Sequence, residues 1–213
     1  MSVPDRIDLA GRLYERAVFG GDTDGLATAD TALDAVEADL ALARGRIIHA
    51  RYLRDRSEDP RELGLFERAA ELYRQGGDAR GEAEALFWVG CFHQVVRDDN
   101  DTAVPLLERS LALAGEAGDR LTASYALRHL GIAEHVAGRL DGARARLEES
   151  VRLRRELGFD AGVAANLVGL AYIASAGGSR ADALALLDEA DELAGAADAG
   201  AIARQVAEAR THV

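Results

Sequence analysis

The chain has 213 residues, nearly half of them apolar, with few aromatic side chains. The apolar residues are mostly Ala, Leu and Val, which suit helices better than sheets, and three prolines leave room for many uninterrupted helices. The formal net charge of -12 argues against nucleic acid and anionic membranes as partners, because both are polyanions that attract a basic surface. We therefore expect an all-α protein that binds neither nucleic acid nor membrane.

The cellular location is predicted from three features. Cys91 is the single cysteine, so no disulfide can form within the chain, and a reducing compartment is favoured. The first residues lack the basic start and apolar core of a signal peptide. The most apolar stretch, residues 163–178, is short for a membrane span and contains Asn166. The sequence predicts a soluble, cytoplasmic protein.

The first elements predicted are two helices separated by a glycine-rich turn. One helix is expected over residues 5–19, the turn at residues 20–25, and the next helix from near Asp24. A break in this second helix is expected near residues 36–38. The alternative is one long helix, which is favoured by a heptad-like apolar series: Leu26, Ala29, Leu33, Val36, Leu40, Ala43 and Ile47.

A helix pair is expected next. Ile47, Ala50 and Leu53 are placed on its first helix. Glu62, Phe66 and Ala69 have the spacing expected for the second helix of a unit.

From residue 78 the chain repeats. Asp78, Asp119 and Asp160 lie 41 positions apart, and Gly77 and Gly118 directly precede the first two. Glycine ends helices by adopting a left-handed conformation, and aspartate starts the next helix by accepting hydrogen bonds from its free N–H groups. The Gly-Asp step therefore predicts a corner between helices.

Each repeat carries a second, internal spacing. In the best-defined unit, Leu127, Leu130 and Gly131 are followed by Ala143, Leu147 and Ser150. Equivalent positions hold Leu86, Val89, Gly90, Ala103, Leu107 and Ser110 in the unit before, and Leu167, Leu170, Ala171, Ala183, Leu187 and Ala190 in the unit after. Small residues allow two backbones to approach closely and leucines fill the space between them. The pattern predicts two antiparallel helices per unit.

This Leu-x-x-Leu-Gly, Ala-x-x-x-Leu-x-x-Ser/Ala pattern resembles the tetratricopeptide repeat (TPR) family. The unit of about 41 residues is longer than the usual ~34 and lacks the terminal proline, as in long-unit bacterial sensor and regulator proteins. The resemblance implies a right-handed superhelical solenoid of antiparallel helix pairs, with four to five units plus a C-terminal capping helix. We expect a single domain over residues 1–213, with units at about 5–36, 37–77, 78–118, 119–159 and 160–198, and a cap at 199–213 whose apolar stripe is Ile202, Val206 and Ala209.

The resemblance also implies a binding groove, because first helices line the concave face of such solenoids. The matching positions are Arg44, Ile47, Arg51, Arg54, Glu84, Phe87, Cys91, Gln94, Tyr125, Arg128, Ile132, His135, Val168, Tyr172 and Ser175. The family's carboxylate clamp is not reproduced, since there is no lysine and Asn166 is a lone asparagine there. We expect a protein or peptide partner whose acidic groups pair with Arg51 and Arg128, within a bacterial regulatory or sensing system.

No catalytic or metal-binding motif is found, so we expect no enzyme activity, cofactor or metal site. His93, His135 and Glu134 are the remaining metal candidates, and Cys91 with His93 is the remaining thiol–base pair. The arginine cluster at Arg144, Arg146, Arg152, Arg154 and Arg155 is interleaved with glutamates, and we expect a solvated face of ion pairs. The alternative function is self-assembly, with a homodimer formed through the broad apolar arc of the first helix.

Overall fold

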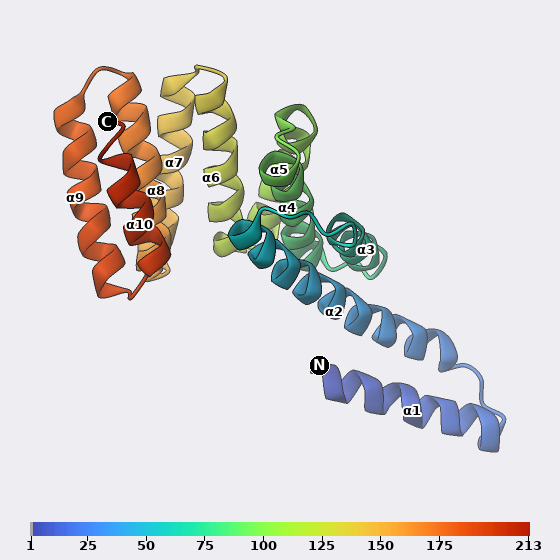
Figure 1. The fold of residues 1–213 in the computed structure, drawn as a ribbon. Helices are drawn as coiled ribbons and strands as arrows, with labels where there is room; N and C mark the ends of the chain where they lie inside the picture. Colours follow the sequence, from blue (N-terminus) through green and yellow to red (C-terminus); the bar gives the residue numbers. More distant parts are fainter. Residues whose placement is uncertain (1) are drawn as a thin grey trace. The chain divides into compact units, whose positions relative to one another are not determined.

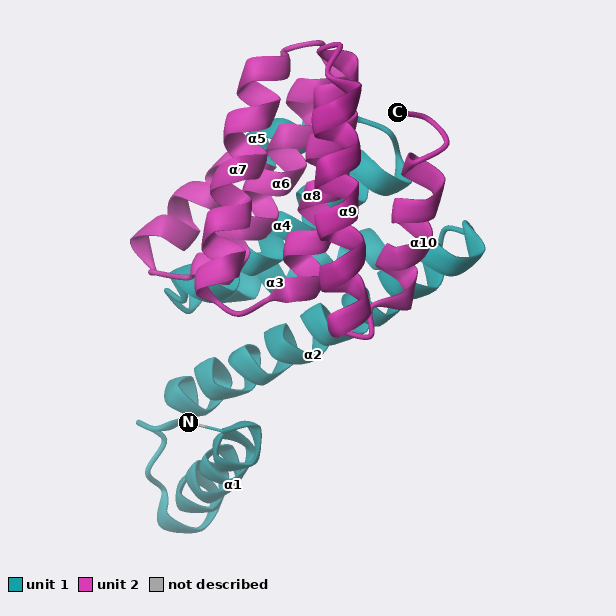
Figure 2. Cartoon of the chain, turned by 90° about the vertical axis from the view of Figure 1, so that its left-hand side faces the viewer, with its two compact units in different colours: residues 1–106 teal, residues 107–213 magenta. Residues whose placement is uncertain are grey.

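The computed structural model describes residues 2–213, and within them the chain is all-α, with ten helices and no strand. The Cα positions form two compact units, residues 1–106 and residues 107–213, coloured separately in Figure 2. In each unit consecutive helices pack in pairs, as in a helical solenoid. The predicted fold class is confirmed. None of the helices in residues 2–213 combines the length and apolarity needed to cross a membrane.

The first unit contains four whole helices and the start of a fifth (Figure 1). They are α1 (Val3–Gly20), α2 (Leu26–Asp55), α3 (Glu62–Gln75), α4 (Ala79–Val96) and α5 (Asn100–Glu116), and the boundary between the units falls within α5. Helix α1 packs on α2, α2 on α3, and α3 on α4.

The start of the chain agrees with the predicted helix over residues 5–19. The Ser2 side chain accepts a hydrogen bond from the backbone N–H of Asp5, and the Asp5 carboxylate accepts one from the backbone N–H of Ser2. This reciprocal arrangement satisfies two N–H groups that the first turn leaves free. After α1, Gly21 has a φ of 73° and ends the helix in the left-handed conformation.

The expected break near residues 36–38 is wrong, because α2 runs unbroken for 30 residues. Nothing in Val36-Glu37-Ala38 disfavours a helix locally. Ala38 is fully buried and Ala41 and Leu42 follow it into the core of the first unit, so the helix continues where its side chains pack. The long-helix alternative suggested by the heptad series is therefore the correct one.

An aromatic stack fills the core of the first unit. Phe66 from α3 is fully buried and lies stacked on Trp88 from α4, with ring centroids 5.5 Å apart. Gly45 of α2 makes room for it, since a Cβ built at that position would lie 2.4 Å from Cε1 of Phe66. No real carbon contact is that short, so α2 and α3 can approach closely only with glycine here.

Gly45→Ala is expected to lower the free energy of unfolding by about 1–3 kcal/mol, because the added methyl group overpacks the site. Helix propensity alone would predict stabilisation of up to about 1 kcal/mol from the same change. Gly64→Ala is the matched control, since it also changes a helical glycine of this unit but has no atom within 4 Å of the new Cβ. Urea denaturation should show opposite signs for the two variants. Stabilisation by both would contradict the close contact.

The second unit consists of the end of α5 and five further helices, drawn from yellow-green to red in Figure 1. They are α6 (Arg120–Val136), α7 (Leu140–Glu156), α8 (Asp160–Ala176), α9 (Arg180–Ala196) and α10 (Gly200–Ala209). Helices α6 to α9 have 17 residues each, and α6 pairs with α7 as α8 pairs with α9.

The corners between helices follow the repeated glycines. Gly118 and Gly158 have φ values of 67° and 66°, and the Asp119 side chain accepts a hydrogen bond from the backbone N–H of Thr122. The prediction holds for Gly77-Asp78 in the first unit as well, where Asp78 accepts from Gly81. At the third of these corners, between α7 and α8, the inserted Phe159 takes the N-cap position. Asp160 is then the first residue of the helix, and no side chain caps this helix.

The repeated small and leucine positions lie in the core, as the spacing predicts. Ala143, Leu147, Ser150, Ala183, Leu187 and Ala190 are all at most 1% exposed. Helix α10 covers the end of this core by packing on α8 and α9. Val206 and Ala209 of its predicted stripe are buried, and Ile202 packs against the same cluster, so the predicted capping helix is confirmed.

Candidate functional site

A hollow of about 310 Å³ lies in the second unit and brings together five of the predicted groove residues: Arg128, Ile132, His135, Val168 and Tyr172. Helices α6 and α8, the first helices of two successive repeat units, supply these residues. Gln205 and Glu208 of α10 complete the rim. We call this space the α6–α8–α10 hollow.

The floor of the α6–α8–α10 hollow is apolar and its shape depends on two glycines. Leu147 of α7 forms part of the floor, and Cβ atoms built at Gly131 and Gly169 would lie 3.1 Å from its side chain. Because these two positions have no side chains, Leu147 can line the α6–α8–α10 hollow. Ile132, Val168, Tyr172 and Ile173 form the remaining apolar lining.

The polar groups of the hollow carry opposite charges at different places on its rim. Arg128 is half-buried, and its Nη1 donates to the carbonyl oxygen of Ala165 at 2.6 Å and to Oδ1 of Asn166 at 2.9 Å. Glu208 is exposed. Burial, and secondarily the charge of Glu208, raises the pKa of the Tyr172 phenol, so that the hydroxyl stays protonated and able to donate.

A second arginine lies close to Arg128 but does not line the hollow. Arg154 of α7 is only 2% exposed and donates from Nη1 to the carbonyl oxygen of Gly162 at 2.7 Å and to Oδ1 of Asn166 at 3.1 Å. Its Nε donates to Oγ of Ser124 at 3.2 Å. Arg128 and Arg154 therefore share one amide oxygen, with no carboxylate in ion-pair contact with Arg154 among residues 2–213.

Aromatic rings take the place of a counter-ion for Arg154. Its guanidinium lies 4.9 Å from the centre of the Tyr125 ring and 5.5 Å from that of Phe159. Such cation–π contacts stabilise a buried positive charge. Burial, and next the charge of Arg128, lowers the pKa of Arg154 to about 10, so that it still carries its charge at neutral pH. The result is a concentration of positive charge at Asn166, where Arg128 and Arg154 meet.

The prediction that Arg154 belongs to a solvated cluster is wrong. The spacing contained a signal for its burial, since Arg154 lies seven residues after Leu147 and four after Ser150 and so shares their helix face. Of the other groove residues predicted in this unit, Tyr125 packs against Arg154 and Ser175 is half-buried on α8. Neither lines the α6–α8–α10 hollow.

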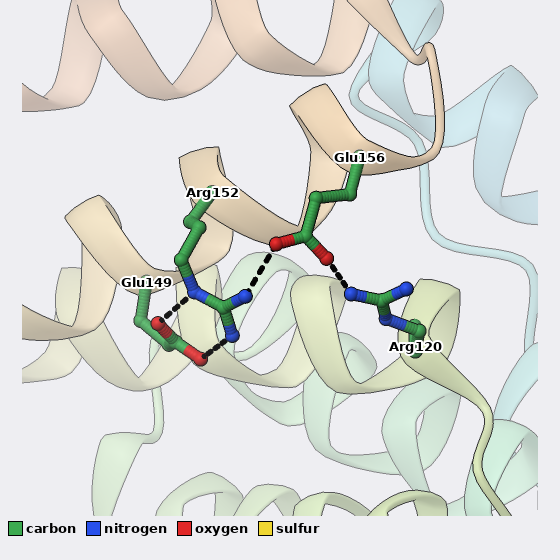
Figure 3. Close-up of polar contacts among 4 residues, drawn as sticks. All are labelled: Arg120, Glu149, Arg152 and Glu156. Carbon is green, nitrogen blue, oxygen red and sulfur yellow. Dashed lines mark hydrogen bonds and ion pairs between the residues drawn. The ribbon is translucent and has the colours of Figure 1, made fainter.

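Two other arginines of the cluster, Arg152 and Arg155, form an ion-pair face, as predicted. Arg152 makes a two-pronged contact with Glu149 at 2.5 and 2.8 Å, and Glu156 lies 2.5 Å from its Nη1 (Figure 3). Glu156 also pairs with Arg120 of α6. These charges are half-exposed, and each such pair contributes about 0–1 kcal/mol to stability.

This ion-pair face borders a larger hollow of about 410 Å³, which we call the α7–α9 hollow. It is lined by Glu148, Val151, Arg152, Arg155, Glu156, Leu167, Leu170, Leu186 and Glu189. Its arginines are already neutralised, because Arg155 pairs with Glu189 at 2.5 Å and Arg152 with two glutamates. The α6–α8–α10 hollow is the better candidate for a ligand despite its smaller volume, since it combines an apolar floor with positive charge.

The groove residues predicted in the first unit divide into exposed and buried sets. Arg44, Ile47, Arg51 and Arg54 are exposed on α2, and half-buried Glu84 pairs with Arg46 at 3.2 Å. Phe87, Cys91 and Gln94 are at most 8% exposed and present almost no surface to a ligand. Phe87 packs edge-on against Trp88, and Gln94 donates to Asn100.

Cys91 lies in a buried carboxylate–imidazole–thiol series. Its Sγ is 3.8 Å from Nε2 of His49, whose Nδ1 is 2.7 Å from Oε1 of Glu62. The order of groups resembles that of a catalytic triad, but all three residues are less than 5% exposed and leave no room for a substrate. Burial raises the pKa of the Glu62 carboxyl, against the opposing effect of His49. We interpret the series as part of the packing of the first unit.

The metal candidates are not brought together. Across residues 2–213 the structure has no group of three or more His, Cys, Asp or Glu side chains placed to hold a metal ion. His93 lies instead against the ring of Phe92.

Comparisons with known proteins find likeness among solved structures. No family model matches the chain, and a search of curated proteins gives no significant match. The chain is similar to the crystal structure of BtubC (BKLC) from P. vanneervenii, with a TM-score of 0.51, 18% sequence identity, and 93% of each chain covered. At this identity the likeness shows a shared fold along nearly the whole chain, and the fold alone.

Proposed function

We propose that this chain is a tetratricopeptide-type scaffold that binds a protein or peptide, with the α6–α8–α10 hollow as the binding site. The observation that carries the proposal is the convergence of Arg128, Ile132, His135, Val168 and Tyr172 on one space. Aromatic and arginine side chains dominate the energetics of many interfaces. A volume of about 310 Å³ is at the lower end of the range for ligand sites and suits one or two side chains of a partner.

The chemistry of the hollow favours a particular kind of segment. Its apolar floor suits a branched or aromatic side chain, and the paired guanidinium groups of Arg128 and Arg154 favour an acidic group beside it. Gln205 and Glu208 lie on the rim, where their side-chain oxygens can accept hydrogen bonds from backbone N–H groups of the same segment. The net charge of -12 disfavours nucleic acid as an alternative partner. We place this role in the cytoplasm of a bacterium, within a regulatory or sensing system.

The proposal is tested by captures from the source cells with matched variants of the full chain. Ile132→Glu places a charge on the apolar floor of the α6–α8–α10 hollow, and Leu186→Glu makes the same change at a half-buried residue of the α7–α9 hollow. The partner should be retained by wild type and by Leu186→Glu and lost with Ile132→Glu, while circular dichroism shows that both variants are folded. A set of captured proteins that is identical for all three would refute the site.

Once the partner is identified, calorimetry measures the contribution of Arg128 to the free energy of binding. Arg128→Ala should weaken binding by about 1–3 kcal/mol. The same change should also lower the melting temperature, because Arg128 donates to Ala165 and Asn166 within the unit. Binding is therefore compared well below the melting transition. Unchanged affinity would remove Arg128 from the site.

A further inference from the structure

Helix α1 is the one element of the chain that buries none of its described residues. Its inner face lies against α2, where Leu9, Ala10, Leu13 and Ala17 are half-buried. Four further apolar side chains are 39–60% exposed and recur at helical spacing: Val3, Ile7, Tyr14 and Val18. Phe19, near the end of the helix, is 84% exposed. Most helical stability in proteins comes from packing of an apolar face, so the α1–α2 hairpin lacks much of the cover that such helices need.

Helix α2 carries a more regular apolar face. Leu26, Leu33, Leu40 and Ile47 lie seven residues apart and are 40–55% exposed. We call these four residues the α2 stripe. A seven-residue repeat stays on one side of a helix and is the pattern that packs against another helix. A second apolar series, three residues after each member of the stripe, gives the alternation of a coiled-coil seam. In it Ala43 and Ala50 are exposed, Val36 is half-buried and Ala29 is buried.

The charges beside the α2 stripe indicate what covers it. The residue directly after each of Ala29, Val36, Ala43 and Ala50 is charged. These charged residues are Asp30 and Glu37 in the first half of the helix and Arg44 and Arg51 in the second. In a parallel pair each of these residues faces the position five before it in the second copy. Arg51 then meets Arg46, Glu37 meets the uncharged Ala32, and only Arg44 meets an opposite charge. An antiparallel pair places Asp30 opposite Arg51 and Glu37 opposite Arg44, on both sides of the two-fold axis.

Three of these four charges are available for such pairing. Asp30, Arg44 and Arg51 are exposed and make no hydrogen bond or ion pair within residues 2–213 of the chain. Glu37 already holds Arg68 of α3 at 2.7 and 3.0 Å, so Arg44 of a second copy would join an existing pair.

The same antiparallel register also matches large side chains with small ones. It places Leu40 opposite Ala43 of the second copy, Leu33 opposite Ala50 and Val36 opposite Ile47. Large residues facing small ones interdigitate without overlap, as helix interfaces require. We propose that α2 binds α2 of a second copy of this chain in antiparallel orientation, so that two α1–α2 hairpins form a four-helix bundle. The dimer is independent of the proposed function, because it uses no residue of the α6–α8–α10 hollow.

The oligomeric state of the full chain is the first test. Sedimentation equilibrium over a wide concentration range should give twice the monomer mass of 22.6 kDa at the upper end. Leu40→Glu, at the centre of the stripe, should give a monomer with an unchanged melting curve in dilute solution, where wild type is also monomeric. Leu157→Glu is the control, because Leu157 is similarly exposed (43% against 48%) but lies after α7. A wild-type chain that remains monomeric, or a Leu40→Glu variant that remains dimeric, would overturn the proposal.

Charge exchange tests the antiparallel orientation. Asp30→Arg and Arg51→Asp should each raise the dimer dissociation constant about tenfold or more, since each places like charges opposite one another. The double variant Asp30→Arg/Arg51→Asp should recover most of the wild-type affinity, because the exchanged charges again face their opposites. Additive weakening in the double variant would refute the antiparallel arrangement.

Discussion

Replacing Arg154 by alanine is expected to lower the free energy of unfolding by about 3 kcal/mol, although arginine is ordinarily a surface residue. The side chain is 2% exposed, and its loss removes one donor each from the Gly162 carbonyl oxygen, Ser124 and Asn166. Hydrogen bonds from a charged group contribute about 1.5–3 kcal/mol each, and the released cost of burying the charge offsets part of their sum. Urea denaturation of the full chain measures the difference.

A second substitution separates the role of the charge from that of volume. Arg154→Met fills most of the same space without a charge, and buried ionic groups can often be replaced by apolar ones at little cost. We expect it to destabilise the protein by less than half as much as Arg154→Ala. Arg152→Ala is the surface control, because Arg152 is half-exposed in its ion pairs and should cost no more than about 1 kcal/mol. Equal effects of alanine at positions 152 and 154 would contradict the buried position of Arg154.

Leu147→Ala is expected to destabilise the protein by about 2–5 kcal/mol, the range for removing a buried leucine side chain. Leu147 is 1% exposed and its side chain contacts the positions of Gly131 and Gly169 on two neighbouring helices. Neither glycine has a side chain that could move into the vacated space, so a cavity should remain. The variant should also enlarge the α6–α8–α10 hollow, of which Leu147 is part of the floor.

Leu121→Ala is the control for this loss of volume. Leu121 belongs to α6 of the same unit but is 42% exposed, and its truncation should change stability by less than about 1 kcal/mol. Comparable losses for the two variants would mean that Leu147 is not a central packing residue. Both are measured by urea denaturation.

Local signals were sufficient for most helix boundaries. Gly118 and Gly158 end helices because a left-handed residue is required there, and Asp119 begins one because its carboxylate satisfies a free N–H group. The 41-residue period also predicted which small residues and leucines lie inside, such as Ala143 and Leu147. These features depend on chain neighbours and on helix periodicity, both of which are written in the sequence.

The candidate site was predictable only in part. Arg128, Ile132 and Tyr172 were expected on one face because they occupy equivalent positions of successive first helices, and they do line one hollow. Phe87 and Cys91 occupy the same kind of position in the first unit but are buried, since Trp88 and His49 pack against them. Equivalent spacing fixes the direction of a side chain and does not fix what covers it.

By itself, then, the sequence determined an all-helical chain with repeated corners and a repeated interior, because these follow from backbone conformation and the helix period. Tertiary structure decided between the broken and the continuous α2 in favour of the continuous helix. It alone decided that Gly45 must admit Phe66 and that Tyr125 and Phe159 are the rings beside Arg154. It also decided that the α2 stripe remains uncovered within the chain. Each of these depends on which distant residue arrives beside a given position, and burial by a distant partner outweighs the local preference of a single residue.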